Sequence, residues 1–174
     1  PAVVDGKVFF GHQDGTVYCL DASTGDKLWN YTTGYPIFSS PAVAYGLVFI
    51  GSNDWTLYAL DMDDGSVVWR YVLNGLIDYA SPTVADGLVF IGSRGSTVYC
   101  LNATAEALTD KERLMWSCDM GGHIRGPCAI ADGKVFVGSF KADVGGELCA
   151  FGALQAPEAS FTFSPASPIP GEVV

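Results

Sequence analysis

Short apolar runs alternate with polar turns along most of the chain. The runs LVFIG at 47–51 and TLYAL at 56–60 are rich in residue types that favour β-strands, and they are shorter than a typical helix. Several runs are joined by Asp-Gly pairs, at 5–6, 86–87 and 132–133. Such pairs suit the two left-handed positions of a two-residue hairpin. The pattern therefore predicts an all-β chain of short strands and tight turns.

The strands are predicted in groups of four. In the clearest group they lie at 42–44, 47–51, 56–60 and 67–71. The group recurs about every forty residues, in units that begin at Pro1, Pro41, Pro82 and Pro127. A glycine keeps the same place in all four units (Gly11, Gly51, Gly92 and Gly138), and a tryptophan does so in the first three (Trp29, Trp69 and Trp116).

Such a unit must stack on its neighbours, because a four-stranded sheet of forty residues cannot bury both of its faces alone. Radial stacking of four-stranded units is the architecture of a β-propeller. The repeated tryptophans are then expected to pack between blades. The fourth unit has no such tryptophan, so its outer strand is expected to be missing. In the third unit the last turn swells to AEALTDKER at 105–113, which we expect to be a surface excursion.

The segment SSPAVAYGLVFIGSNDWTLYALDMDDGSVVWRY resembles the repeat of the pyrroloquinoline-quinone-like (PQQ-like) propeller family. The resemblance extends over residues 1 to 154. It implies blades that belong to a ring of seven or eight, in which the two ends of a chain often complete one blade together. Because about four repeats are present, we expect the C-terminal part of a larger ring, or an incomplete ring that needs a partner.

The composition changes after residue 154, where Pro and Ser become frequent. The segment PEASFTFSPASPIPGEVV resembles the opening of a polycystic-kidney-disease-type (PKD) domain, an immunoglobulin-like sandwich. The resemblance implies a second unit at 155–174 that holds a linker and the first strand or two of such a domain. It also implies a secreted or cell-surface protein of a prokaryotic envelope, for instance archaeal. A disordered Pro-rich tail is the alternative.

The charge balance excludes some partners. Acidic residues number 19 against 9 basic ones, for a formal charge of -10. An anionic surface does not suit nucleic acid or anionic lipid. No apolar run reaches the roughly 20 residues of a membrane span, so we predict neither nucleic-acid binding nor membrane insertion. The chain begins with Pro1 rather than Met, which favours a processed chain or an excerpt of a longer one.

The five cysteines are predicted to be free thiols. Cys19 and Cys100 hold the same strand position two units apart, where a small buried side chain is expected. The other three are Cys118, Cys128 and Cys149, and their predicted strands lie too far apart for bridges. Two N-x-[ST] sequons make Asn30 and Asn102 candidates for glycosylation in a secreted protein.

The residues for quinoprotein chemistry are not evident in the sequence. The resemblance implies a quinone with calcium, and dehydrogenases of this type carry an adjacent cysteine pair that this chain lacks. Most acidic residues fall in repeated turns, where turn formation explains them. No other catalytic or metal-binding motif is present, and the two histidines, His12 and His123, have no partner at ligand spacing. We therefore predict no catalytic residue, metal or cofactor; PQQ with calcium applies only if the protein is an enzyme.

Departures from the repeat mark a candidate binding face. In a propeller, the loops from strand four to the next strand one and those from strand two to strand three share one face. The second set includes His12, Asp14, Asn53, Asp54 and Asp143. Trp55 stands where the first unit has Gly15, so it is expected to be exposed. The candidate binding residues are Tyr35, Phe38, Trp55, Asp78, Tyr79, Arg94, His123, Arg125 and Lys141.

Three hypotheses of function follow. The first is a non-catalytic extracellular or cell-surface propeller that binds protein or glycan on this face, with further blades or another chain at its open edges. The second is the C-terminal part of a quinoprotein alcohol or sugar dehydrogenase. The third is a structural subunit of a surface assembly, since unpaired sheet edges favour association.

Overall fold

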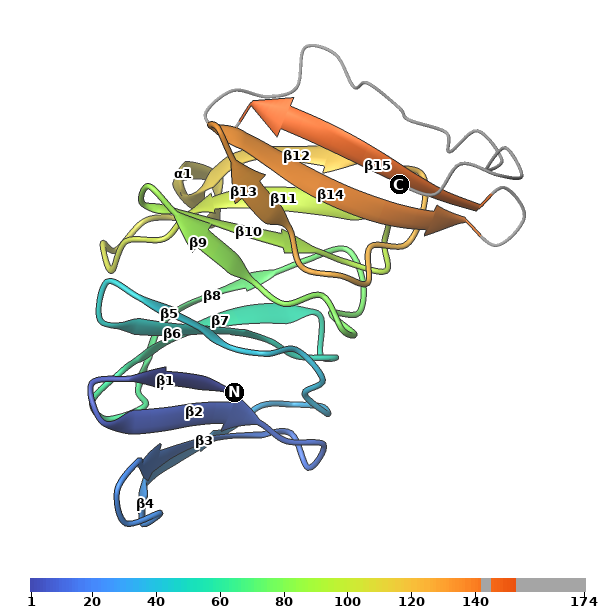
Figure 1. The fold of residues 1–174 in the computed structure, drawn as a ribbon. Coiled ribbons are helices and arrows are strands. Elements are labelled where there is room, and N and C mark those ends of the chain that lie inside the picture. The colour runs from blue at the N-terminus through green and yellow to red at the C-terminus, as the bar shows by residue number, and fades with distance from the viewer. Residues whose placement is uncertain (142–144, 153–174) are drawn as a thin grey trace, which may run out of the picture.

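A computed structural model describes residues 1–141 and 145–152, which fold into four antiparallel sheets (Figure 1). Blade one contains β1 (Ala2–Val4), β2 (Lys7–Gly11), β3 (Thr16–Asp21) and β4 (Lys27–Thr32). Blade two contains β5 (Ala42–Ala44), β6 (Leu47–Gly51), β7 (Thr56–Asp61) and β8 (Val67–Val72). Blade three contains β9 (Thr83–Ala85), β10 (Leu88–Gly92), β11 (Thr97–Asn102) and β12 (Leu114–Asp119). Blade four contains β13 (Ala129–Ala131), β14 (Lys134–Lys141) and β15 (Gly145–Gly152).

Within each sheet the strands follow one another in chain order, and the sheets are stacked in sequence from the blue to the orange end of Figure 1. This is the blade arrangement of a β-propeller, so the predicted fold class is confirmed. One short helix, α1 (Asp110–Arg113), interrupts the described strands. No helix in the described ranges is long and apolar enough to cross a membrane.

The hairpins between the first two strands have the predicted geometry. Asp5 and Gly6 have φ values of 49° and 72°, and Tyr45 and Gly46 have 54° and 72°. Two adjacent left-handed residues define the turn whose twist matches antiparallel strands. Blade two therefore keeps the turn although a tyrosine stands where the other blades have aspartate.

The core lies between the blades rather than inside any one sheet. Phe9 and Trp29 of blade one pack with Val48 and Ile50 of blade two in one buried cluster. The ring centroids of Phe9 and Trp29 lie 5.9 Å apart. The three repeated tryptophans are 8%, 7% and 5% exposed, which confirms that they pack between blades.

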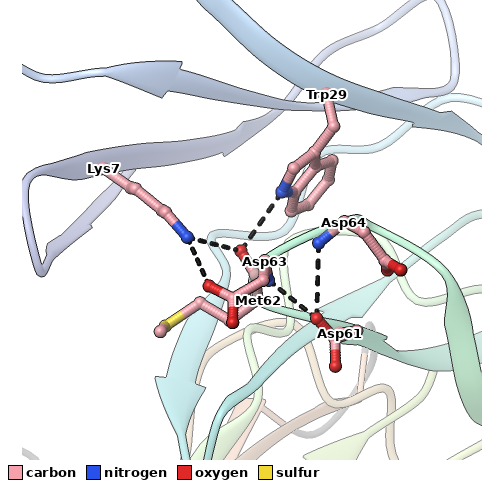
Figure 2. A network of polar contacts seen from close by, with 6 residues as sticks. All are labelled: Lys7, Trp29, Asp61, Met62, Asp63 and Asp64. Carbon is pink, nitrogen blue, oxygen red and sulfur yellow. Dashed lines mark hydrogen bonds and ion pairs between the residues drawn. The ribbon is translucent and has the colours of Figure 1, made fainter.

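Each of the first two tryptophans also donates a hydrogen bond to the next blade, and Figure 2 shows the bond made by Trp29. Trp29 Nε1 donates to the carbonyl of Met62 at 3.1 Å, and Trp69 Nε1 donates to the carbonyl of Thr104 at 3.0 Å. We call the contact region between two neighbouring blades a joint. Lys7 adds an ion pair to the joint between blades one and two, because its Nζ lies 2.5 Å from Asp63 Oδ1. The hydrogen bond to Asp63 raises the pKa of Lys7. The blades are thus joined by polar contacts as well as by apolar packing.

The expectation that residues 105–113 form a surface excursion is wrong for Arg113. A capping box between Thr109 and Glu112 starts α1, and Arg113 at its end is 2% exposed. The guanidinium carbon lies 4.2 Å from the centroid of the Trp69 ring. The insertion therefore carries a cation into the joint between blades two and three.

The described part of blade four is three-stranded, as expected from its missing tryptophan. Residues 153–174 lie outside the described ranges, so the PKD-like start and the boundary near 154 stay predictions. The five cysteines are free, as predicted, and all but Cys118 are buried.

We expect the stability of the chain to fall in acid partly through Asp21. Its pKa is lowered to about 2, first by the hydroxyl of Ser23 and then by the backbone N–H groups of Thr24 and Ser23. A carboxyl whose pKa is lower in the folded state contributes stability above its unfolded pKa and loses it as the pH falls through the folded value. Asp21→Asn should therefore flatten the pH dependence of unfolding between about pH 4 and pH 2. A carboxyl titration of Asp21 by NMR with a midpoint near 4 would contradict this prediction.

Candidate functional site

Two sets of loops meet on one face of the blades, as the repeat predicts. The backbone N–H of Thr33 donates to the carbonyl of Gly15 at 2.8 Å, which joins the loop after β4 to the turn after β2. The N–H of Leu73 donates to the carbonyl of Trp55 at 2.8 Å in the next blade. We call this surface the loop face; it comprises residues 12–15, 33–41, 52–55, 73–82, 93–96 and 120–128.

The structure distributes the predicted binding residues over three neighbouring groups. The first group is a hollow of about 430 Å³ that contains two of the candidates and is lined by Tyr35, Asn53, Asp54, Trp55 and Leu76. The second is an aromatic pair, Phe38 and Tyr79, whose ring centroids are 5.5 Å apart. The third links Asp78, Arg94 and His123. Tyr35, Trp55 and Tyr79 are 64%, 48% and 58% exposed, so the predicted exposure of Trp55 is confirmed.

The third group crosses from blade two to blade four. Arg94 Nη1 lies 3.9 Å from Asp78 Oδ2. The carbonyl oxygen of Arg94 lies 2.5 Å from His123 Nδ1. His123 also pairs with Phe140 through its backbone, which places it beside the end of β14. These contacts order the loops, so packing explains most of this group.

The remaining candidates are more dispersed. Lys141 lies at the end of β14 beside Gly121, and Arg125 is exposed on the loop before β13. Asp143 lies outside the described residues. Asn30 is exposed on β4, whereas Asn102 is half-buried and its Oδ1 accepts a hydrogen bond from Thr104 N at 2.8 Å. Glycosylation at either asparagine stays a prediction.

Asp54 organises the floor of the hollow. Its Oδ1 accepts from the backbone N–H of Thr56 at 3.0 Å, and its Oδ2 accepts from Gly34 N at 2.9 Å and Tyr58 Oη at 2.7 Å. Burial and this last hydrogen bond raise the pKa of Tyr58. A carboxylate can accept about four hydrogen bonds. With three donors bound, the Asp54 carboxylate has capacity for one more hydrogen bond.

Blade one builds the same turn around Asp14. Its Oδ1 accepts from Thr16 N at 2.8 Å, and its Oδ2 accepts from Tyr18 Oη at 3.0 Å. Desolvation is the largest single influence on the pKa of Asp14 and raises it, but the hydrogen bonds from Thr16, Tyr18 and His12 together outweigh desolvation and lower the pKa. The turn in blade one has Gly15 where blade two has Trp55. The two turns thus share their carboxylate but differ in the exposed aromatic side chain.

Blade three stabilises the corresponding turn with different residues, which the sequence alone did not suggest. Gly95 stands at the repeat position of Asp54. Asn74 stands at the repeat position of Gly34, the glycine that donates to Asp54. The Asn74 side chain donates to the Gly95 carbonyl at 2.9 Å and to Thr97 Oγ1 at 2.7 Å, and it accepts from Ser93 Oγ at 2.7 Å. A Cβ on Gly95 would overlap the Asn74 amide. The polar side chain that stabilises this turn therefore comes from the loop after β8, whereas in blades one and two it comes from the turn itself.

A second hollow, of about 490 Å³, lies beside the inner strands of blade one. Its lining includes Pro1, Val8, Phe10, Phe38 and Pro41. Val8 and Phe10 lie on the side of blade one that faces away from blade two. This hollow therefore belongs to the open side of the first blade.

A calcium ion needs several oxygen ligands gathered at one point. Within the described ranges, no three His, Cys, Asp or Glu side chains are grouped so that they could hold a metal ion. The carboxylates of Asp14, Asp21 and Asp54 are instead engaged by N–H and hydroxyl donors of their own turns. Their oxygens serve turn geometry, so no reaction step is assigned to them.

Comparison with known proteins supports the fold. A family model described as outer membrane protein assembly factor BamB matches residues 1–105. BamB from Moraxella catarrhalis superposes with a TM-score of 0.70 at 22% identity, over 85% of this chain and 43% of its own. The computationally designed Ika8 protein gives 0.72 at 20% identity, over 92% and 47%. Quinohemoprotein alcohol dehydrogenase ADHIIG from Pseudomonas putida HK5 gives 0.76 at 18% identity, over 94% and 33%.

The chain spans less than half the length of each of these structures. At such low identity, the likeness shows a shared propeller fold and nothing further. No curated protein matches the sequence.

Proposed function

The chain belongs to the PQQ-repeat family described as outer membrane protein assembly factor BamB, and we propose that it is a non-catalytic propeller module that binds a protein or glycan ligand on its loop face. One observation carries the proposal: three exposed aromatic side chains lie on neighbouring loops of this face. Tyr35, Trp55 and Tyr79 are all exposed there. Aromatic anchors of this kind dominate many binding interfaces.

The proposed location is the cell surface or the exterior of a prokaryotic cell. The description of the family, which names an outer-membrane assembly factor, supports an envelope location. The acidic charge of the chain is consistent with a partner that is neither nucleic acid nor lipid.

The open sides of the blades are proposed to be covered by further blades or by another chain. Val8, Phe10 and Leu20 of blade one are half-buried. The residues at the same repeat positions in blade two, Val48, Ile50 and Leu60, are fully buried against blade one. A structural assembly between chains would cover the same side, and a defined oligomer in native mass spectrometry would favour it over a single longer polypeptide.

A quinoprotein dehydrogenase is the alternative, since one of the similar structures is a quinohemoprotein alcohol dehydrogenase. It predicts quinone absorbance and calcium-dependent dye reduction by the full-length protein. Under the binding proposal, neither is expected.

We expect photo-crosslinking to place the partner on the loop face. A photoreactive phenylalanine at Tyr35 or Tyr79 of the full-length protein, in its own cells, should yield a discrete adduct. The same residue at Leu28 or Met115, which are comparably exposed on outer strands β4 and β12, should not. Adducts from the outer strands alone would contradict the proposed face.

A further inference from the structure

The hollow between Tyr35 and Trp55 combines two energetically unfavourable features. Trp55 has a φ of 71°, a left-handed conformation that costs a non-glycine residue about 1 kcal/mol or more. The corresponding residue of blade one is Gly15, at φ 85°, where the conformation carries no such cost. Asn53 Oδ1 is buried and has no hydrogen-bond partner among the described residues. Ser96 of blade three has the same conformation, at φ 68°, so the left-handed residue is a property of the repeated turn. The unsatisfied Asn53 Oδ1 beside an exposed Trp55 ring is what distinguishes this turn from the other two and points to a role in binding.

The loops around the hollow are held in place by hydrogen bonds. The carbonyl of Tyr35 accepts from Thr33 Oγ1 at 2.9 Å and from Ser52 Oγ at 3.0 Å. The N–H of Asn53 donates to the carbonyl of Pro36 at 3.1 Å. The two aromatic residues are therefore attached to fixed backbone, which lowers the entropic cost of binding.

The chemistry of the lining selects a cation. Tyr35 and Trp55 present exposed rings, and the faces of such rings attract ammonium and guanidinium groups. Asp54 adds a carboxylate from the same lining, and the hollow has no Lys or Arg among its lining residues. The net charge of -10 further favours a basic ligand.

We propose that this hollow binds an arginine or lysine side chain of a partner protein, with the cation against Trp55 and Tyr35 and near the Asp54 carboxylate. The inference rests on the proposed binding function of the loop face and specifies the chemistry of the partner. A neutral glycan stacked on the same rings is the outcome that would replace it.

The test uses the full-length protein and the peptide acetyl-Gly-Arg-Gly-Arg-Gly-amide. Calorimetry gives the dissociation constant. Trp55 is the exposed one among the four tryptophans of this sequence, so a fluorescence change on titration that Trp55→Gly removes would report binding at this hollow. The same peptide with citrulline in place of arginine keeps the shape and removes the charge. We expect it to bind at least tenfold more weakly. Raising the salt concentration should weaken only the arginine peptide.

Variants then locate the site. Trp55→Gly, which installs the residue of blade one, should weaken arginine-peptide binding about tenfold, within the range of a cation–π contact. Asp54→Asn should weaken it about fivefold and reduce its salt dependence. Asp14→Asn is the matched control, because Asp14 makes the same turn contacts without a tryptophan beside it. It should leave binding unchanged.

Three results would overturn the cation assignment: equal binding of the arginine and citrulline peptides, equal effects of Asp14→Asn and Asp54→Asn, or binding of maltohexaose that Trp55→Gly abolishes while the arginine peptide fails to bind. If loop-face adducts still form in cells after such a result, the binding face stands and only its ligand class is wrong. If peptide binding is lost in Trp55→Gly but adducts form only on outer strands, the hollow binds cations and the proposed partner face is wrong.

Discussion

Replacing Arg113 with alanine is expected to lower the free energy of unfolding by about 4 kcal/mol. Its Nη1 donates to the backbone carbonyls of Asn102 at 2.8 Å and Thr104 at 3.1 Å, and its Nη2 donates to the backbone carbonyl of Glu106 at 2.7 Å. The substitution removes one donor from each of these carbonyls and the cation above Trp69. The Thr104 carbonyl keeps its bond from Trp69 Nε1, and the Glu106 carbonyl keeps its bond from the N–H of Leu108. Hydrogen bonds to a charged group contribute about 1.5–3 kcal/mol each, and they are not additive.

Urea unfolding followed by tryptophan fluorescence would measure this loss. Arg70→Ala is the control, because Arg70 is exposed on β8 of blade two and its removal should change stability by less than about 0.5 kcal/mol. Arg113→Lys should fall between the two, since a lysine cannot reach three carbonyls in the same fixed fork. If Arg113→Ala and Arg70→Ala unfold at the same urea concentration, the insertion contributes nothing to the joint.

The second large effect is expected at the repeated glycine that ends the second strand. A Cβ on Gly51 would overlap Ile77 Cγ2 and would lie 3.1 Å from Ile77 Cβ. Ile77 is fully buried between blades two and three, so it has no free space to move into. Gly51→Ala should therefore destabilise the chain by about 3 kcal/mol, the upper part of the usual range for an overpacked core.

The fourth blade provides the matched control for this substitution. Gly138 holds the same repeat position, but a Cβ there would meet no atom of the described residues within 4 Å. Gly138→Ala should leave the urea midpoint nearly unchanged. Ile77→Ala should recover part of the stability lost in Gly51→Ala, which a double-mutant cycle would report as a favourable interaction. Equal losses at Gly51 and Gly138 would show that backbone freedom, rather than the close approach of Ile77, explains the glycine.

The architecture was predictable because its determinants are local and repeated. The two-residue hairpins need two adjacent left-handed residues, and the Asp-Gly pairs in the sequence indicate where these hairpins lie. The tryptophans recur because each one fills the same joint between blades. For the candidate site, the repeat also placed Trp55 on a turn and predicted its exposure, since a turn glycine cannot be replaced by a core side chain.

Other features depend on contacts between loops, which no single unit encodes. Nothing in the sequence AEALTDKER indicates that its last residue turns inward onto Trp69 of the preceding unit. Asn74 and Gly95 likewise compensate for each other across two loops, 21 positions apart. Leu76 was missed as a part of the hollow, because it reaches that site only through the packing of blade three beside blade two.

The buried thiols make the separation of neighbouring blades measurable by chemical modification. Burial raises the pKa of both Cys100 and Cys128 to about 12, so almost no thiolate exists in the folded protein at neutral pH. Both side chains lie in the cluster between blades three and four, whereas Cys19 lies between blades one and two. An alkylating reagent can therefore modify each site only when that joint opens. The rate of alkylation at Cys19 would therefore report how often blades one and two separate, and the rates at Cys100 and Cys128 would report the same for blades three and four.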